Sequence, residues 1–89
     1  MEYVDDKMLL ARIRRSYNHI SRRLRMDGKA ETRLFEFEKI EKERFPAHCR
    51  ISFVTGFSAT IKLTGEKYYV SQTVFFGRAD WSLYREESK

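Results

Sequence analysis

The segment ISFVTGFSATIKLTGEKYYVSQTVFF, residues 51–76, has the pattern of a β-hairpin. From residue 51 to residue 63 every odd position is apolar or threonine, and the even positions are mostly small or polar. Such alternation is typical of a strand with one buried face. Gly65 falls where a two-residue type II′ turn needs its first central residue. This turn predicts a register in which Phe57 faces Val74 and Gly56 faces Phe75.

The preceding segment, AETRLFEFEKIEKERF at residues 30–45, fits two kinds of structure. Its Ala, Leu, Glu, Lys and Arg residues favour a helix. The alternation of Phe35 and Phe37 with glutamates is instead typical of a short strand. We favour a second helix over a strand, and Pro46 ends the element in either case.

The chain begins with a long amphipathic helix, which the sequence predicts over residues 6–26. Asp6 suits its start, because a carboxylate there can accept hydrogen bonds from free backbone N–H groups. Gly28 suits the left-handed conformation that ends many helices. At about 100° per residue, the apolar side chains form one stripe: Leu9, Leu10, Ile13, Tyr17, Ile20 and Leu24.

These elements predict a single domain, residues 1–89, of the α+β class. The N-terminal helix, with the second helix, packs on one face of a small antiparallel sheet whose central hairpin spans about 50–76. The sequence does not decide the structure of the tail, residues 78–87, because Trp81 fits a closing helix as well as a last strand. We expect the apolar stripe to meet six hairpin residues: Phe53, Phe57, Ile61, Leu63, Val70 and Val74.

The composition is that of a small globular protein, since 42% of its 89 residues are hydrophobic and 15% are aromatic. Its single cysteine, Cys49, excludes an internal disulfide and fits a reducing compartment. Together with His48 it is too few for a zinc site, and neighbours on a strand face opposite ways. No apolar run approaches the roughly 18 residues of a membrane span. We expect a cytoplasmic, non-enzymatic protein with no cofactor, no metal and no membrane partner.

The net charge of +5 is concentrated in the first helix and the residues that follow it. Residues 7–29 carry eight Lys or Arg residues against one acid, Asp27. Guanidinium groups suit phosphate, because they stay charged and offer forked hydrogen-bond donors. The alternative is a solvated face, partly neutralised by the glutamates between residues 31 and 43. The residues expected to contact nucleic acid or an acidic partner are Arg12, Arg14, Arg15, Arg22, Arg23, Arg25 and Lys29.

The outward face of the hairpin is a second candidate surface. Aromatic rings with basic neighbours on a sheet can stack on bases. An ordinary solvated sheet face is the favoured interpretation of this surface. The strand at residues 50–64 would also leave a long edge open to pairing with a second copy, so a homodimer is a further alternative. The residues of this sheet-face patch are Arg50, Lys62, Tyr69 and Phe75.

The segment VFFGRADWSLYR, residues 74–85, resembles the C-terminal end of bacterial toxin ribonucleases of the RelE type. The expected order of helices and strands is similar across most of the chain. This resemblance implies RNA cleavage, in which Arg78, Tyr84 and Arg85 orient and stabilise the RNA phosphate. In the same reaction His48 would donate a proton.

The sequence therefore predicts a small binding protein that contacts nucleic-acid phosphates, of RNA or DNA, through its arginine-rich helix. It would act as a regulator or accessory factor. An alternative is a protein-binding inhibitor or adaptor of the phage or plasmid type, acting on a larger host complex that carries or processes nucleic acid. The ribonuclease toxin is the lesser alternative.

Overall fold

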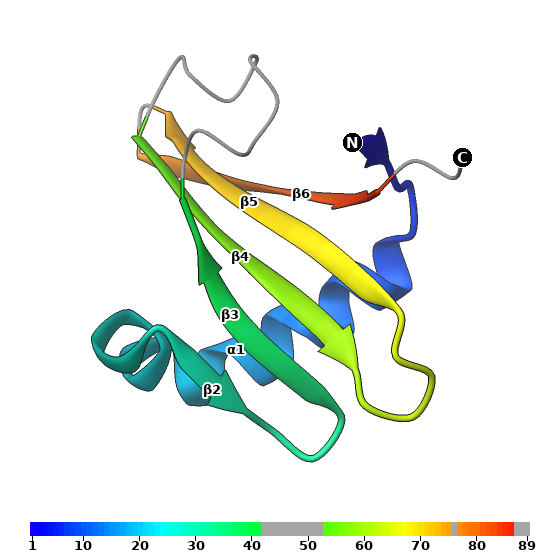
Figure 1. Ribbon diagram of the computed structural model, residues 1–89. Coiled ribbons are helices and arrows are strands. Elements are labelled where there is room, and N and C mark those ends of the chain that lie inside the picture. The colour runs from blue at the N-terminus through cyan, green and yellow to red at the C-terminus, as the bar shows by residue number, and fades with distance from the viewer. Residues whose placement is uncertain (42–52, 76, 87–89) are drawn as a thin grey trace.

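The computed structural model describes residues 1–41, 53–75 and 77–86. In these residues one helix, α1 (Lys7–Asp27), lies across one face of a six-stranded antiparallel sheet (Figure 1). This confirms the predicted α+β class, with a long N-terminal helix packed on a sheet. The strands are β1 (Glu2–Tyr3), β2 (Lys29–Glu31), β3 (Phe35–Ile40), β4 (Phe53–Ile61), β5 (Lys67–Phe75) and β6 (Arg78–Arg85).

Helix α1 begins and ends within one residue of the predicted bounds, because its capping residues act as expected. Oδ1 of Asp6 accepts a hydrogen bond from the backbone N–H of Leu9 at 3.0 Å. At the other end Gly28 has a φ of 77°, and its N–H donates to the carbonyl of Leu24 at 2.8 Å. A left-handed residue in that position turns the chain out of the helix.

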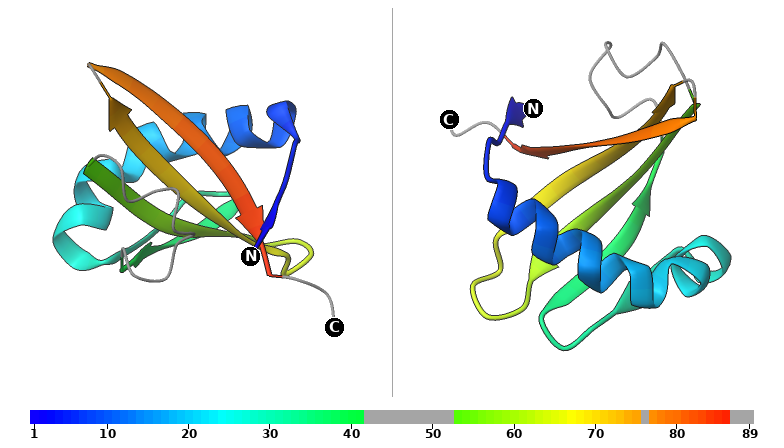
Figure 2. Two further views of the ribbon diagram at one scale, coloured as in Figure 1. Left: turned by 90° about the horizontal axis from the view of Figure 1, so that it is seen from above. Right: turned by 180° about the vertical axis from the view of Figure 1, so that it is seen from behind.

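The strand order is β1-β6-β5-β4-β3-β2. Strands β3 to β6 form an antiparallel meander, and the short strands β1 and β2 lie at its two edges. Since α1 joins these two edge strands, it crosses the sheet from one edge to the other, as both views of Figure 2 show. We call the side covered by α1 the helix face and the opposite side the far face.

The main core lies between α1 and the helix face. The Tyr17 ring stacks on Phe57 of β4, with centroids 4.5 Å apart and an interplanar angle of 12°. Trp81 of β6 meets Tyr17 edge-on at 5.4 Å. The predicted stripe is confirmed: Ile13, Tyr17, Ile20 and Leu24 are buried, and Leu9 and Leu10 are half-buried.

The predicted second helix is wrong, because residues 29–31 and 35–40 form strands β2 and β3. Burial of two phenylalanines in the core outweighs the helix propensity of this segment. Alternation along β3 places Phe35 and Phe37 together on the helix face, where both are buried in the core. Thr32 closes the turn before β3, since its N–H donates to the carbonyl of Phe35 at 2.9 Å and its Oγ1 accepts from the Phe35 N–H at 3.2 Å.

The hairpin of β4 and β5 is confirmed, but its predicted register is wrong. Phe57 faces Val70 rather than Val74, and Gly56 faces Ser71 rather than Phe75. The connecting loop, residues 62–66, is longer than a type II′ turn and contains Gly65. With a φ of 78°, Gly65 donates its N–H to the carbonyl of Ile61 at 2.8 Å.

The shift of register is even, so each strand keeps its predicted face. Its consequences fall at the ends of the hairpin. Leu63, predicted in the core, lies in the loop and is 93% exposed, and Val74 is 39% exposed. Phe57, Ile61 and Val70 do pack with the helix stripe. The side chain of Phe53 lies outside the described part of the chain.

The tail forms strand β6, in which Leu83 is buried and Trp81 half-buried on the helix face. The expectation that residues 50–64 leave an open edge is wrong, because β4 is a central strand flanked by β3 and β5. The edges of the described sheet are instead β1 and β2, and β1 pairs with only Tyr84 and Arg85 of β6.

The far face is partly buried rather than an ordinary solvated sheet face. Tyr69 and Tyr84, which face each other across β5 and β6, form a second small cluster with Ile40. These two residues are 1% and 2% exposed, respectively. The small neighbours Ser58 and Ser71 are buried there as well. The rings of Tyr69 and Tyr84 are therefore used within the fold.

Candidate nucleic-acid interface

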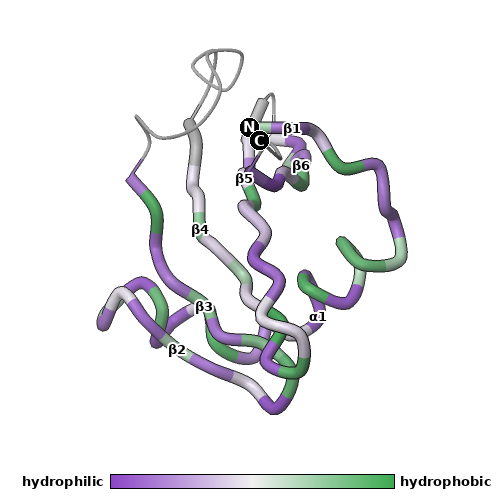
Figure 3. The backbone as a smooth tube through the Cα atoms, turned by 45° about the vertical axis from the view of Figure 1, so that its right-hand side comes forward, coloured by the Kyte–Doolittle hydropathy of each residue, from purple (hydrophilic) through white to green (hydrophobic). Residues whose placement is uncertain are grey.

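All six arginines of α1 are exposed, since none of them belongs to the apolar stripe. Along the helix the chain alternates between hydrophobic and hydrophilic residues (Figure 3). Because the apolar stripe faces the sheet, Arg15, Arg22 and Arg25 lie on the side of α1 that is turned to solvent. We call these three residues the outer arginines. Ten residues separate the first from the last, which corresponds to about 15 Å of helix.

No carboxylate of the described residues neutralises the outer arginines at ion-pair distance, and the same holds for Arg12 and Arg23. The two ion pairs found in this part of the chain lie elsewhere, between Lys62 and Glu31 and between Arg85 and Glu2, each at 3.2 Å. The strands explain this separation. The glutamates of β2 and β3 alternate with core residues and therefore project from the far face, away from the outer arginines: Glu31, Glu36 and Glu38.

Arg14 differs from the outer arginines, because it packs against the fold. Its guanidinium carbon lies 5.0 Å from the centroid of the Trp81 ring. This is the geometry of a cation–π contact. The contact fixes the flank of α1 that lies nearest to β6.

The other flank of α1 faces β2 and the turns. Arg23 and Lys29 line one cavity of about 430 Å³, together with the glutamates of β2 and β3. Arg22, Arg23 and His19 also line a hollow of about 400 Å³ near the end of the helix, together with Asp27, which makes no ion pair with them. Arg12 lines a separate groove at the other end. Arg23 thus shares one hollow with Lys29 and another with Arg22, whereas Arg12 and Arg14 lie elsewhere.

The residues of the sheet-face patch do not form a base-stacking surface in the described part of the chain. The buried Tyr69 donates its hydroxyl to Glu86 at 2.8 Å, and the Lys67 ammonium lies 5.4 Å from the centroid of its ring. Lys62 lies in the loop after β4, where it pairs with Glu31. Arg50 and the side chain of Phe75 lie outside the described residues.

The residues implied by the resemblance to toxin ribonucleases are spread along β6. Arg78 and Arg85 stand at opposite ends of this strand, about 23 Å apart along an extended chain. Tyr84 is buried on the far face, with its ring 5.9 Å from that of Tyr3. His48 lies outside the described residues. Arg78 and Arg85 therefore do not converge on one phosphate.

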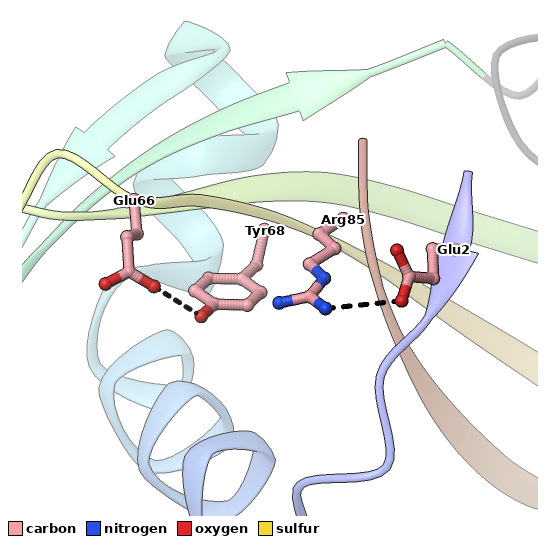
Figure 4. A network of polar contacts seen from close by, with 4 residues as sticks. All are labelled: Glu2, Glu66, Tyr68 and Arg85. Carbon is pink, nitrogen blue, oxygen red and sulfur yellow. Dashed lines mark hydrogen bonds and ion pairs between the residues drawn. The ribbon is translucent and has the colours of Figure 1, made fainter. Parts of the chain in front are cut away.

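Arg85 has a structural role at the edge of the sheet. It donates to Oε1 of Glu2 at 3.2 Å and so ties β1 to β6 (Figure 4). This hydrogen bond raises the pKa of Arg85. On its other side lies Tyr68, whose hydroxyl donates to Glu66 at 2.8 Å. That hydrogen bond, followed by burial, raises the pKa of Tyr68.

Other kinds of site find no support among the described residues. These residues contain no group of three or more His, Cys, Asp or Glu side chains placed to hold a metal ion. Within the same ranges no helix is both long enough and apolar enough to cross a membrane. Comparison of the chain with protein-family models, curated proteins and solved structures found no match.

Proposed function

We propose that this protein binds nucleic acid through the phosphate backbone, using the outer arginines of α1. One observation carries the proposal: in the described part of the chain no carboxylate lies within ion-pair distance of the outer arginines. A cation without an internal partner is available to an external anion, and phosphate is the anion that guanidinium groups suit best.

The geometry of α1 supports backbone contact rather than base readout. The outer arginines extend over about 15 Å of helix, which corresponds to the rise of about four base pairs at about 3.4 Å each. They stand on a helix whose opposite side is packed in the core. Contacts to phosphate position a protein on nucleic acid but carry no sequence information. We therefore propose a regulator or accessory factor of low sequence specificity, acting in the cytoplasm.

A direct test is fluorescence anisotropy with labelled mixed-sequence duplex DNA and single-stranded RNA. The informative variant carries Arg15→Gln, Arg22→Gln and Arg25→Gln, which removes the charges of the outer arginines. Glutamine has a helix propensity close to that of arginine, so the fold should be kept. We expect at least a tenfold loss of affinity for the better ligand.

The matched control carries Arg33→Gln, Lys39→Gln and Arg78→Gln, which removes three exposed charges that are not on α1. It has the same net charge as the first variant, so it separates a local effect from a global one. We expect the control to bind within about threefold of the natural chain, since none of these three charges stands on the solvent-facing side of α1. Equal losses in both variants, or no binding by the natural chain, would contradict the proposal.

A further inference from the structure

We propose that a groove between the start of α1 and two neighbouring turns binds an acidic segment of a partner protein that inserts apolar side chains. This inference goes beyond nucleic-acid binding and uses a different part of the surface. The groove has a volume of about 500 Å³. We call it the turn groove, and the residues that line it are Leu9, Arg12, Arg33, Leu34, Phe35, Ile61, Lys62 and Leu63.

The turn groove is assembled from three separate segments. The turn between β2 and β3 and the loop between β4 and β5 lie next to each other, and the N–H of Lys62 donates to the carbonyl of Leu34 at 3.0 Å. Both turns are seen side by side in Figure 1 and beside the first half of α1 in Figure 2. Helix and turns therefore form the walls of one concave surface.

The apolar side chains in this groove are unusual for their positions. Turn tips are normally polar, yet Leu34 and Leu63 stand at two adjacent tips and are 55% and 93% exposed. The buried ring of Phe35 and the half-buried Leu9 and Ile61 continue the apolar surface inwards. Isolated exposed leucines need no explanation, but contiguous apolar surface rimmed by polar groups is typical of interaction sites.

The charge of the lining identifies the kind of partner. Three of the lining residues are the cations Arg12, Arg33 and Lys62, and no carboxylate is among them. Lys62 is paired with Glu31, whereas Arg12 and Arg33 make no ion pair with any described residue. An apolar groove with a basic rim complements a segment that combines leucine-like anchors with carboxylates, because charge complementarity guides association and register.

The concave shape favours a polypeptide over a lipid surface. A membrane-binding helix presents its own apolar stripe to the bilayer, but the stripe of α1 is buried against the sheet. A groove lined by side chains suits anchor residues spaced three and four apart on an amphipathic helix. The geometry therefore points to an acidic amphipathic segment as the occupant.

The test is an NMR titration of the ¹⁵N-labelled chain with a synthetic peptide of about 15 residues, with leucines three and four apart and glutamates elsewhere. Two matched peptides are titrated in parallel. One carries lysines in place of the glutamates, and the other has the same composition with the leucines scrambled. We expect saturable shift changes at residues 9, 12, 33–35 and 61–63 with the first peptide only.

The variant that decides the outcome is Leu34→Ser with Leu63→Ser. Both side chains are exposed, so the chain should keep its fold, and the loss of two apolar anchors should weaken peptide binding at least about tenfold. Shift changes confined to the outer arginines, or unaffected by this double variant, would overturn the proposal. Since the outer arginines stay intact, its failure is distinguishable from failure of nucleic-acid binding.

Two further measurements test the other candidate occupants of the groove, which are a lipid surface and a second copy of the chain. Vesicles of phosphatidylcholine and phosphatidylserine in equal amounts should not bind the chain in a manner that depends on Leu34 and Leu63. Without peptide, the NMR chemical shifts of the groove residues should not change with protein concentration. Sedimentation of the chain should show a monomer. Leucine-dependent vesicle binding would overturn the proposal in favour of a lipid surface. Concentration-dependent groove shifts would overturn it in favour of a second copy.

Discussion

The guanidinium carbon of Arg14 lies 5.0 Å from the centre of the Trp81 ring, whereas its neighbour Arg15 faces solvent from the other side of α1. Trp81 in turn meets Tyr17 and Phe57 edge-on, at 5.4 Å and 6.0 Å. Arg14 therefore extends a stack of core rings outwards to the surface. Two arginines that are adjacent in sequence thus have different roles, one in the fold and one in the proposed interface.

Replacement of these two arginines should separate stability from binding. Arg14→Ala should lower the free energy of unfolding by about 0.5–1 kcal/mol through loss of the cation–π contact and leave affinity for nucleic acid within about twofold. Arg15→Ala should leave stability within about 0.5 kcal/mol and weaken binding. Urea unfolding followed by Trp81 fluorescence, together with anisotropy, measures both quantities. Equal losses of affinity would place Arg14 in the interface.

The stability of two variants should distinguish the observed register of the hairpin of β4 and β5 from the register predicted from the sequence. Ile13→Ala opens a cavity in the core between α1 and the sheet and should cost about 2–5 kcal/mol, a large part of the stability of so small a domain. Leu63→Ala should cost less than about 0.5 kcal/mol, because this side chain lies in an exposed loop. Calorimetry of both variants tests this contrast. A large loss for Leu63→Ala would favour the register that the type II′ turn predicts.

The end of α1 should depend on the backbone conformation of Gly28. An added Cβ would meet no atom within 4 Å there, so the cost of Gly28→Ala comes from its φ of 77° alone. We expect a loss of about 1–2 kcal/mol, and a smaller loss for Gly28→Asn, because asparagine tolerates the left-handed region better. Urea denaturation of the two variants provides the comparison. An alanine variant as stable as the natural chain would contradict this explanation of the helix end.

Stability should fall at alkaline pH because of two tyrosines. The hydrogen bond to Glu66, then burial, raises the pKa of Tyr68, while burial raises that of Tyr17 against an opposing effect of Arg25. Above about pH 10 the unfolded chain loses these protons before the folded chain does. The free energy of unfolding should therefore be constant with respect to these groups below about pH 10 and decrease above it.

Tyr68→Phe tests this pH dependence, since it removes one of the two groups. Denaturation in urea between about pH 9 and 11 should show a shallower decline for the variant than for the natural chain. Tyr17 should account for part of the decline that remains. An unchanged slope in the variant would show that Tyr68 does not contribute.

Local signals in the sequence predicted the helix well, because its caps and its apolar stripe lie within one element. Asp6 and Gly28 determine its ends without help from the rest of the chain. Strand β3 is the alternative that the sequence disfavours, because its helix propensity is overridden only by burial of Phe35 and Phe37 against α1. The register was missed for a different reason: Gly65 satisfies both a two-residue turn and the longer loop that forms.

Exposure of the outer arginines follows from the spacing of about 100° per residue along the helix alone. Their freedom from carboxylates did not, because it depends on which face of the sheet the glutamates occupy. That in turn required β2 and β3 to be strands rather than a helix. The turn groove could not be predicted either, because Leu34 and Leu63 come together only through the pairing of β3 with β4. A leucine at each turn tip is the signal that could have indicated it.

The most direct measurement is the dependence of nucleic-acid affinity on salt, for the natural chain and for the variant lacking the outer arginines. Release of counterions makes the logarithm of the binding constant for duplex DNA fall with that of the salt concentration, by about 0.9 per phosphate contacted. The account predicts a steep slope for the natural chain and a slope smaller by about two to three in the variant. A salt-independent affinity, or identical slopes for both proteins, would contradict it.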